Sequence, residues 1–449
     1  MRPMLVLGIA CLPAIAIAQH PPGEHNSPNV RVVSHVQLAT STDVKVEQEL
    51  SRPYVYVSSG RTGGFVVVSV KDPARARVIY NWQIEDPELH QGGALSPMHL
   101  KTNGRYYFTQ SFQFRQGGPD YDLGAVVFDV TGLPDSSKVK EVARIRTPDT
   151  PGGFHETFAY KHSDGRALLF ATTVSQGASV FDIAKVVAGG PGLAGRIPLP
   201  VANPYGTGAP SPGVNELLAR ALPGYHDFYV GYDMATKRDL FYGAGATGYF
   251  VYDVSNLAEP KLVTSITGVA GVPFGHTFTP TPDGRYAVTE VEYQYAPLRI
   301  FDLKPGLDGQ VKTISRPVGA WTPNWKNLPH NHEVRWPYVF VSSYKDGLQV
   351  FNMMDPTNPY TVGFYDMFDA PDDFGSQNAG VLGSMGGTFG VDVRNADGLI
   401  VASDSRFGLW ALKMDGFDGW NGHQWGMPNQ SSAQDWDNGP DGAPKQKVS

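Results

Sequence analysis

Short runs of alternating hydrophobic and polar residues, separated by turns, recur along the whole chain. One such unit starts at Arg52 and reads "RPYVYVSSGRTGGFVVVSVKDPARARVIYNW", and another starts at Lys237 and reads "KRDLFYGAGATGYFVYDVSNLAEPKLVTSI". Alternation with a period of two is typical of a β-strand that buries one face. Gly and Asn supply the positive backbone angles of hairpin turns, and Pro marks strand ends. The pattern therefore predicts a series of antiparallel hairpins.

The same unit occurs seven times. Further copies start at Asn103, Asp164, Asp283, Arg335 and Asp397. In each copy a turn leads into a strand that ends in small polar residues, followed by a Gly-containing turn, a second strand, a Pro-rich turn and a third strand. One more strand precedes each copy. The sequence thus predicts an all-β protein, a seven-bladed β-propeller of four-stranded antiparallel blades. No helical periodicity alternates with the strands, which excludes an α/β fold.

The predicted propeller spans residues 30–415. The stretch "VRVVSHVQLAT" at Val30–Thr40 is one strand too many before the first unit, and the last unit lacks a fourth strand. We therefore expect this N-terminal strand to close the ring as the outer strand of the last blade, so that neither sheet edge stays open. Residues 19–29 are expected to be flexible, and residues 416–449, rich in Gly, Asn, Asp and Gln, to form an irregular tail.

Residues 1–18 have the form of a cleaved signal peptide, with one Arg, an apolar stretch and Ala16-Ile17-Ala18 at the end. The expected location is the periplasm or outside the cell. Cys11, the one cysteine of the chain, lies in this segment. A lipid anchor on Cys11 is the disfavoured alternative, because Gly8 stands where lipoproteins usually have a large aliphatic residue. The mature chain therefore has no thiol, and its chemistry depends on His, carboxylates, Tyr and hydroxyl groups.

The overall charge narrows the possible partners. The 449 residues carry a formal net charge of -7 and no run of Lys or Arg, which argues against a nucleic-acid partner. After the signal peptide no apolar run approaches the ~20 residues of a transmembrane helix. A small-molecule substrate is the expected partner.

Two of the units resemble a known family. "YVYVSSGRTGGFVVVSVKDPARARVI" and "YVFVSSYKDGLQVFNMMDPTNPYTVGFY" are similar to the LVIVD repeat of secreted bacterial β-propellers. This resemblance implies a propeller and an extracytoplasmic location, and it implies little about activity.

Five of the 12 histidines precede the repeat turn in successive units. The first strand of every propeller blade is innermost, and all first strands run in the same direction, so residues at their starts meet at one mouth of the central channel. We therefore expect several imidazoles to bind one transition metal ion, copper or iron first, with zinc as an alternative. A hydrogen-bond network that joins blades is the structural alternative. The expected ligands are His155, His226, His276 and His332, with His99 as a less well aligned fifth.

Acidic residues follow several of these histidines. Glu156 and Asp227 are expected to point away from the metal and to orient the histidine of a neighbouring blade, or to join blades by hydrogen bonds. His330 lies two residues before His332 and, in a regular strand, on the same face. His330 and Glu333 are the predicted proton-transfer groups.

Long loops precede four of the innermost strands and are expected at the same mouth. The segment "PGVNELLARAL" from Pro212 predicts a short lid helix. The aromatic residues Tyr225, Trp321 and Trp325 are predicted to line a substrate pocket, the alternative being that the loops only cover blade edges. The loops are residues 83–98, 197–225, 316–329 and 366–387.

The histidine segments "FHETF", "GYHDFYVGY" and "LPHNHEVRWPYVFVSS" resemble those of selenium-binding proteins, which include bacterial methanethiol oxidases. That resemblance implies a copper-dependent propeller, although the cysteine motif of the family is missing. "YHDFYV" also resembles a motif of carotenoid-cleaving oxygenases, which implies iron held by four histidines.

The leading hypothesis is a metal-dependent oxidoreductase, an oxidase or oxygenase, that acts on a small organic molecule. The first alternative is a non-catalytic propeller that binds a protein or a glycan on its loop face. The second is a metal-dependent lactonase, which is disfavoured because such propellers bind Ca²⁺ through oxygen ligands.

Overall fold

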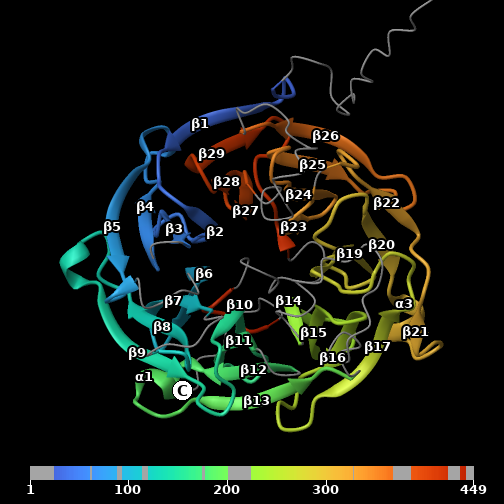
Figure 1. Ribbon diagram of the computed structural model, residues 1–449, viewed down its shortest axis with the longest axis horizontal. Helices are drawn as coiled ribbons and strands as arrows, with labels where there is room; N and C mark the ends of the chain where they lie inside the picture. Colours follow the sequence, from blue (N-terminus) through green and yellow to red (C-terminus); the bar gives the residue numbers. More distant parts are fainter. Residues whose placement is uncertain are drawn as a thin grey trace, which may run out of the picture.

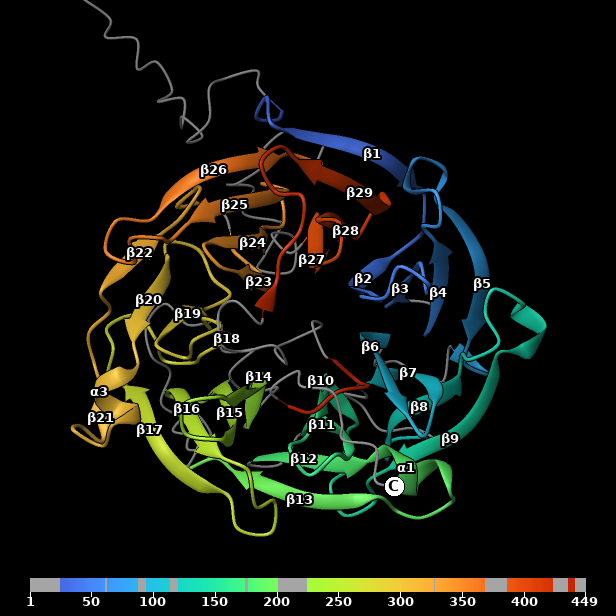
Figure 2. The ribbon, with the colours of Figure 1, turned by 180° about the vertical axis from the view of Figure 1, so that it is seen from behind.

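The computed structural model describes residues 25–60, 63–87, 94–113, 120–173, 177–200, 224–326, 328–367, 386–422 and 435–440. Seven small antiparallel sheets stand around a central channel, as a view down the channel shows (Figure 1). The same ring is seen from behind in Figure 2. The predicted seven-bladed propeller is confirmed. The predicted signal peptide and the lid helix at Pro212 lie outside the described residues.

The blades follow one another in chain order, each built from the channel outward. Blade 1 consists of β2 (Ser41–Val46), β3 (Tyr54–Ser59), β4 (Gly64–Ser69) and β5 (Arg77–Gln83). Blade 2 consists of β6 (Ala94–Thr102), β7 (Arg105–Phe112), β8 (Leu123–Asp129) and β9 (Lys140–Arg146). Blade 3 consists of β10 (Phe154–Lys161), β11 (Ala167–Thr173), β12 (Gly177–Asp182) and β13 (Leu193–Pro198). Blade 4 consists of β14 (Tyr225–Asp233), β15 (Arg238–Gly245), β16 (Gly248–Asp253) and β17 (Lys261–Thr267), and β21 (Thr313–Ile314) adds a short parallel strand beside β17. Blade 5 consists of β18 (Thr277–Pro280), β19 (Tyr286–Glu290), β20 (Leu298–Asp302) and β22 (Gly319–Trp321).

Blade 6 is β23 (His332–Arg335), β24 (Tyr338–Ser342), β25 (Leu348–Asn352) and β26 (Tyr360–Tyr365). Blade 7 is β27 (Thr388–Arg394), β28 (Leu399–Asp404) and β29 (Gly408–Met414), completed by β1 (Val30–Val36). The helical elements are short: η1 (Pro73–Arg75), η3 (Ser136–Lys138), α1 (Ile183–Val187) and α3 (Lys304–Leu307). None of the described helices is long and apolar enough to cross a membrane.

The N-terminal strand closes the ring as predicted. Strand β1 pairs antiparallel with β29 from Val30 opposite Met414 to Val36 opposite Leu409. The first and last parts of the propeller are thus held in one sheet, and β29 is not left as an open edge.

The hydrophobic core lies between the blades. Second and third strands such as β8, β11 and β12 are buried along their whole length, whereas outer strands such as β5 alternate between exposed and half-buried residues. Aromatic rings fill the space where blades 1 and 2 face each other: Phe65 lies 4.3 Å from Phe108 between ring centroids, and Phe108 lies 4.5 Å from Tyr56. Because both faces of the middle strands are covered, their apolar runs show less alternation than the outer ones.

The innermost strands share a local irregularity that decides the site. Where each begins, two of its residues lie opposite one residue of the second strand, which is a β-bulge. The register shifts in this way between Phe154 and Thr157 in β10 and between Tyr225 and Asp227 in β14. In blade 6 the pair is His330 and Asn331, which both bond to the backbone of Ser342. The seven bulges all lie at one mouth of the channel, which we call the histidine end.

The other mouth, where the innermost strands turn back, is called the turn end. Here the described C-terminal residues 435–440 lie against blades 2 and 3. The buried Lys161, the last residue of β10, donates to the backbone carbonyls of Asp435 (3.2 Å), Trp436 (2.7 Å) and Asn438. Lys101 in β6 pairs with Asp437 at 2.6 Å. This part of the tail therefore has specific contacts, although it forms no strand.

Candidate metal centre

The bulges place one residue of every blade at the same level of the histidine end. Blades 3 to 6 each provide a histidine at this level, and the other three blades provide uncharged residues. In order from blade 1 to blade 7 the residues are Thr42, Leu95, His155, His226, His276, His330 and Phe389. Four imidazoles from four successive blades therefore stand side by side.

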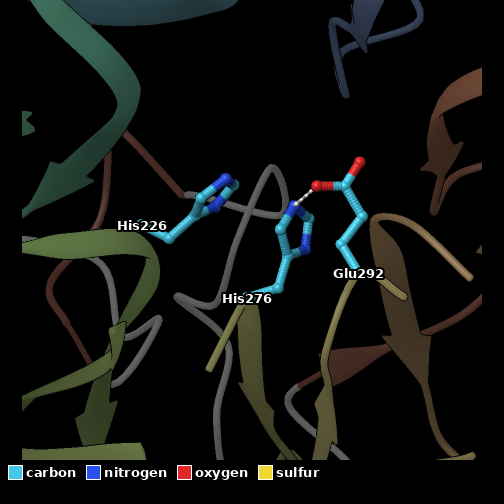
Figure 3. A group of neighbouring side chains, drawn as sticks. All are labelled: His226, His276 and Glu292. Carbon is cyan, nitrogen blue, oxygen red and sulfur yellow. Dashed lines mark ion pairs between the residues drawn. The ribbon is translucent and has the colours of Figure 1, made fainter. Parts of the chain in front are cut away.

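Three of the residues at this end can hold a metal ion. The donor atoms of His226, His276 and Glu292 all lie within 4.8 Å of one another, and all three side chains are buried. His276 lies between the other two, with its Nε2 3.4 Å from Oε2 of Glu292 (Figure 3). The centroids of the His226 and His276 rings are 3.9 Å apart.

Two more histidines flank this group. Nε2 of His155 lies 3.0 Å from Nε2 of His226, and Nε2 of His330 lies 3.8 Å from Oε1 of Glu292. Two donors on bonds of about 2.1 Å at right angles would lie about 3 Å apart, so the first spacing is that of two ligands of one ion. The imidazoles of His155 and His330 thus extend the group at both sides.

Hydrogen bonds to Nδ1 fix the direction of the rings. Nδ1 of His330 lies 2.6 Å from the carbonyl oxygen of Phe389, and Nδ1 of His155 lies 3.0 Å from Oε1 of Gln113. Nδ1 of His276 lies 2.6 Å from Oε2 of Glu290. A carbonyl oxygen only accepts, so Nδ1 of His330 must carry the proton. This is the arrangement by which proteins orient metal-bound imidazoles.

A neutral His330 then presents the lone pair of its Nε2 toward a carboxylate oxygen of Glu292. Glu292 lies within ion-pair distance of His276 and His330, and the hydroxyl of Tyr344 donates to its Oε1. Lone pairs and a carboxylate that converge in a buried space repel one another unless a cation or a proton lies between them. The donor set therefore fits a metal ion.

Burial keeps His276 and His330 neutral. It lowers the pKa of His330 to about 4, with His332 adding to the effect. Burial and the histidines His330, His155 and His332 hold the pKa of His276 well below its ordinary value. Burial and the nearby Glu292 raise the pKa of Glu290 well above its ordinary value. Neutral imidazole is the form that binds metals, so the site needs no deprotonation step at neutral pH.

The structure places His330 beside His276, and it leaves His332 out of the group. Because His330 and Asn331 share the bulge, the alternation of the strand restarts after them, and His332 falls on the face that holds Val44 and Val391 in other blades. Neither ring nitrogen of His332 has a hydrogen-bond partner among the described residues. His330 therefore stands in the group of histidines, where His332 was expected, and His332 lies outside it.

His99 lies away from the group as well. It is the sixth residue of β6, deeper in the channel wall, and its ring stacks on Tyr56 at 6.2 Å between centroids. Burial, together with Arg52 and Lys45, lowers its pKa to about 3. His99 stands four residues before the turn at Asn103, so it lies further along the strand than the bulge.

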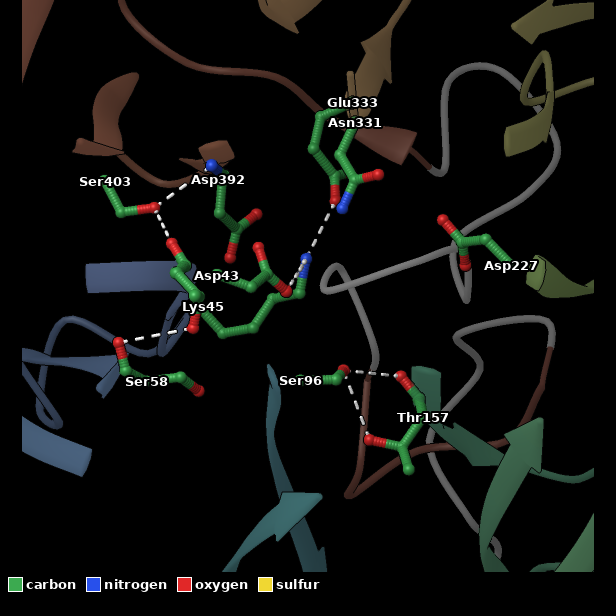
Figure 4. Close-up of polar contacts among 12 residues, drawn as sticks. Asp43, Lys45, Ser58, Ser96, Thr157, Asp227, Asn331, Glu333, Asp392 and Ser403 are labelled. Carbon is green, nitrogen blue, oxygen red and sulfur yellow. Dashed lines mark hydrogen bonds and ion pairs between the residues drawn. The ribbon is translucent and has the colours of Figure 1, made fainter. Parts of the chain in front are cut away.

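The acidic residues after the histidines face the channel below them. Glu156 and Asp227 line a small cavity of about 30 Å³ together with Asp43, Lys45 and Glu333. The Lys45 ammonium lies 3.5 Å from Glu333 and 3.9 Å from Asp43, while Asp227 stands apart (Figure 4). Burial raises the pKa of Asp227 to about 7. The hydrogen bonds that orient the imidazoles come instead from Gln113, Glu290 and the Phe389 carbonyl.

Glu333, expected to transfer protons, is held in an ionic network. It accepts a hydrogen bond from Tyr229 Oη at 2.6 Å and one from Arg335 Nη1 at 3.0 Å. These partners lie in the channel toward the turn end. The carboxylate that stands beside the histidines is Glu292.

The aromatic residues expected above the metal are dispersed. Tyr225 is fully buried between blades, where its hydroxyl donates to the Pro198 carbonyl at 2.9 Å. Trp321 and Trp325 line a separate cavity of about 340 Å³ on the outer rim, with Pro359 and Tyr360. The aromatic rings that contact the histidines are Phe274, Tyr344 and Phe389.

Sequence reasoning missed Glu290 and Glu292. A signal was present, because the second strand of blade 5 ends in "TEVEY", whereas most units end this strand in Ser or Thr. Gln113 likewise follows the second strand of blade 2. Acidic or amide residues at these strand ends thus contact a histidine of the same blade, as Glu290 and Glu292 contact His276, or of the next blade, as Gln113 contacts His155.

Comparison with known proteins gives the fold and little more. No family model matches the chain, and no curated protein matches its sequence. The structure of Raptor from Chaetomium thermophilum is similar, with a TM-score of 0.55 and 11% sequence identity. The match covers 86% of this chain and 29% of the Raptor chain. The propeller is thus shown, while the resemblance to LVIVD-repeat and selenium-binding proteins finds no support in these comparisons.

Proposed function

We propose that this protein is a metalloenzyme that holds one transition metal ion through Nε2 of His155, His226, His276 and His330. The observation that supports the proposal is the group of His226, His276 and Glu292, flanked by Nε2 of His155 on one side and Nε2 of His330 on the other, while Nδ1 of three rings is bonded elsewhere. Imidazole-rich sites favour Cu, Fe or Zn over Ca²⁺ and Mg²⁺. This argues against the lactonase alternative.

Glu292 is assigned a proton-handling role beside the metal. Its carboxylate lies within 4 Å of two of the histidines and accepts from the hydroxyl of Tyr344. Burial and Glu292 itself hold the pKa of Tyr344 well above its ordinary value, so the phenol keeps its proton. Tyr344 therefore fixes one oxygen of Glu292 and leaves the other toward the metal group, where it can bind the ion or accept a proton from substrate.

The reaction class we favour is oxidation of a small organic molecule. A redox-active ion such as copper or iron, when bound, supplies electron transfer and the activation of O₂. The chain supplies neutral imidazoles, a buried carboxylate and a channel mouth. We propose that this activity lies outside the cytoplasm, a location that the signal-like N-terminus supports. The competing function, a non-catalytic propeller that binds a protein or glycan, does not need the converging imidazoles.

The proposal is tested by metal analysis of the full chain purified without chelators or affinity metals. We expect close to one equivalent of copper, iron or zinc in the wild type. His276→Ala should lose at least about tenfold in metal affinity, since it removes the central ligand. Glu292→Gln keeps the size of the side chain and should lower turnover more than metal content.

The matched control is His99→Ala, which removes a half-buried histidine of the channel wall that lies outside the group. It should keep its metal. A wild type that binds none of the three metals after incubation with each would contradict the proposal, and so would equal metal loss in His99→Ala and His276→Ala.

A further inference from the structure

The four histidines occupy only part of the mouth. At the same level blades 7, 1 and 2 present Phe389, Thr42 and Leu95, and none of these is charged. An ion held by blades 3 to 6 is therefore bounded by protein ligands on one side and by these three residues on the other. Phe389 and Leu95 are half-buried, so part of each remains accessible.

Aromatic rings pack directly on the two histidines that lie near the ends of this arc. Phe389 lies 4.2 Å from His330 between ring centroids, and Phe274 lies 6.0 Å from His226, edge to face. Tyr344 also contacts His330, at 5.0 Å, with its hydroxyl already bonded to Glu292. Phe274 and Tyr344 are buried, so Phe389, which is half-buried, is the ring of these three that keeps apolar surface accessible to a ligand.

Among these three residues only Thr42 carries a hydroxyl group, and this hydroxyl already has partners. Oγ1 of Thr42 donates toward the Ala94 carbonyl at 3.0 Å and the Ser58 carbonyl at 3.4 Å, which turns its methyl group toward Gly60. An ionic ligand group placed here would lose its water and gain no charged partner from these residues, which is unfavourable. An alkyl or aryl group has no such hydration to lose, so its burial here is not opposed in this way.

We infer that the side of the metal centre formed by blades 7, 1 and 2 takes an uncharged, mainly apolar organic group, an alkyl or aryl substituent, which packs against Leu95 and Phe389. This rests on the proposed function and specifies its substrate class. Leu95 and Phe389 are specificity-determining residues, because they contact the part of the ligand that does not bind the metal. Selectivity comes from buried apolar area on one side and metal binding on the other.

The experiment compares two probes on the metal-loaded protein. Imidazole and 4-phenylimidazole bind a metal through the same nitrogen, and the second adds one aryl group. Titration of the Cu(II)- or Co(II)-loaded chain, followed by its visible spectrum, should show 4-phenylimidazole binding about tenfold more tightly, the ratio expected for burial of most of a phenyl face. Leu95→Asp should remove this preference, because the phenyl group would then have to displace water from a carboxylate.

The matched control is Leu50→Asp, which introduces the same charge at an exposed leucine of the turn end, 58% exposed. It should keep the tenfold preference. Leu95→Ala gives a second, milder loss should Leu95→Asp fail to fold. Equal affinity for the two probes in the metal-loaded wild type would overturn this inference and leave the metal centre intact. A protein that takes up no metal would instead contradict the proposed function.

Discussion

The two ends of the channel use the same seven strands for different purposes. At the turn end, charged groups have close partners of opposite charge. Arg52 donates two hydrogen bonds to Glu47, at 2.5 and 2.9 Å, and Tyr56 donates a third at 2.6 Å. At the histidine end, one ligand atom each of His226, His276 and Glu292 lies within 4.8 Å of the other two. The turn end is thus built from paired opposite charges, whereas the histidine end brings together groups that can bind a metal ion.

This difference indicates which end of the channel can hold reactive buried groups without loss of the fold. A buried polar group without its partner costs free energy, so it persists only where the rest of the structure is stable enough. Here closure of the ring by β1 and the ion pairs at the turn end supply that stability. Changes at the turn end should therefore alter folding and spare the metal, and changes at the histidine end should do the reverse.

The largest effect is expected from Arg52→Met. Glu47 would be left buried with only the hydrogen bond from Tyr56, and breaking a buried ion pair typically costs about 3 kcal/mol or more. Urea unfolding should show this loss, with metal content unchanged. Arg105→Met, which breaks the pair of a largely exposed arginine with Asp129, is the control and should unfold like the wild type. Loss of metal in Arg52→Met would show that the two ends are coupled.

An intermediate effect is expected from Lys161→Met. The variant removes the ammonium that binds three carbonyls of residues 435–440, which should cost about 2 kcal/mol. Limited proteolysis followed by mass spectrometry should detect faster cleavage beyond Met414. Lys140→Met, at an exposed position of an outer strand, should leave the cleavage rate unchanged. Equal rates in both variants would mean that the tail is not held by Lys161.

The smallest effect is expected from His332→Val. Blades 1 and 7 hold Val44 and Val391 at this position, and neither ring nitrogen of His332 makes a hydrogen bond of good geometry in the described part of the chain, although the nearby Val288 carbonyl acts to raise its pKa. Replacing it by an apolar residue should therefore leave stability unchanged or raise it by about 1 kcal/mol, measured as the midpoint of thermal unfolding. His332→Asn keeps an unpaired polar group and should gain nothing. A large loss in His332→Val would point to a missing partner of that ring.

The fold could be predicted from the sequence because its unit repeats. Seven copies of one strand pattern leave few arrangements, and the surplus strand at Val30 has one place to go, beside β29. The gathering of histidines at one mouth followed from the same repetition, since residues at equivalent positions of successive blades must meet around the axis.

The sequence could not show which histidines belong to the group, because this depends on the one extra residue that a bulge adds to the strand. A strand without a bulge would put His330 and His332 on one face, and the bulge at His330 and Asn331 separates them. Glu292 was missed for another reason. It lies beyond the end of β19, and its contact with His330 joins two blades, which no local pattern records.

The central claim is that His330, and not His332, belongs to the metal centre. The most direct test is the metal content of His330→Ala and His332→Ala, purified side by side and measured by elemental analysis. We predict that His330→Ala falls well below one equivalent under conditions where His332→Ala retains about one, and that both variants fold. Full retention in His330→Ala together with loss in His332→Ala would contradict the account.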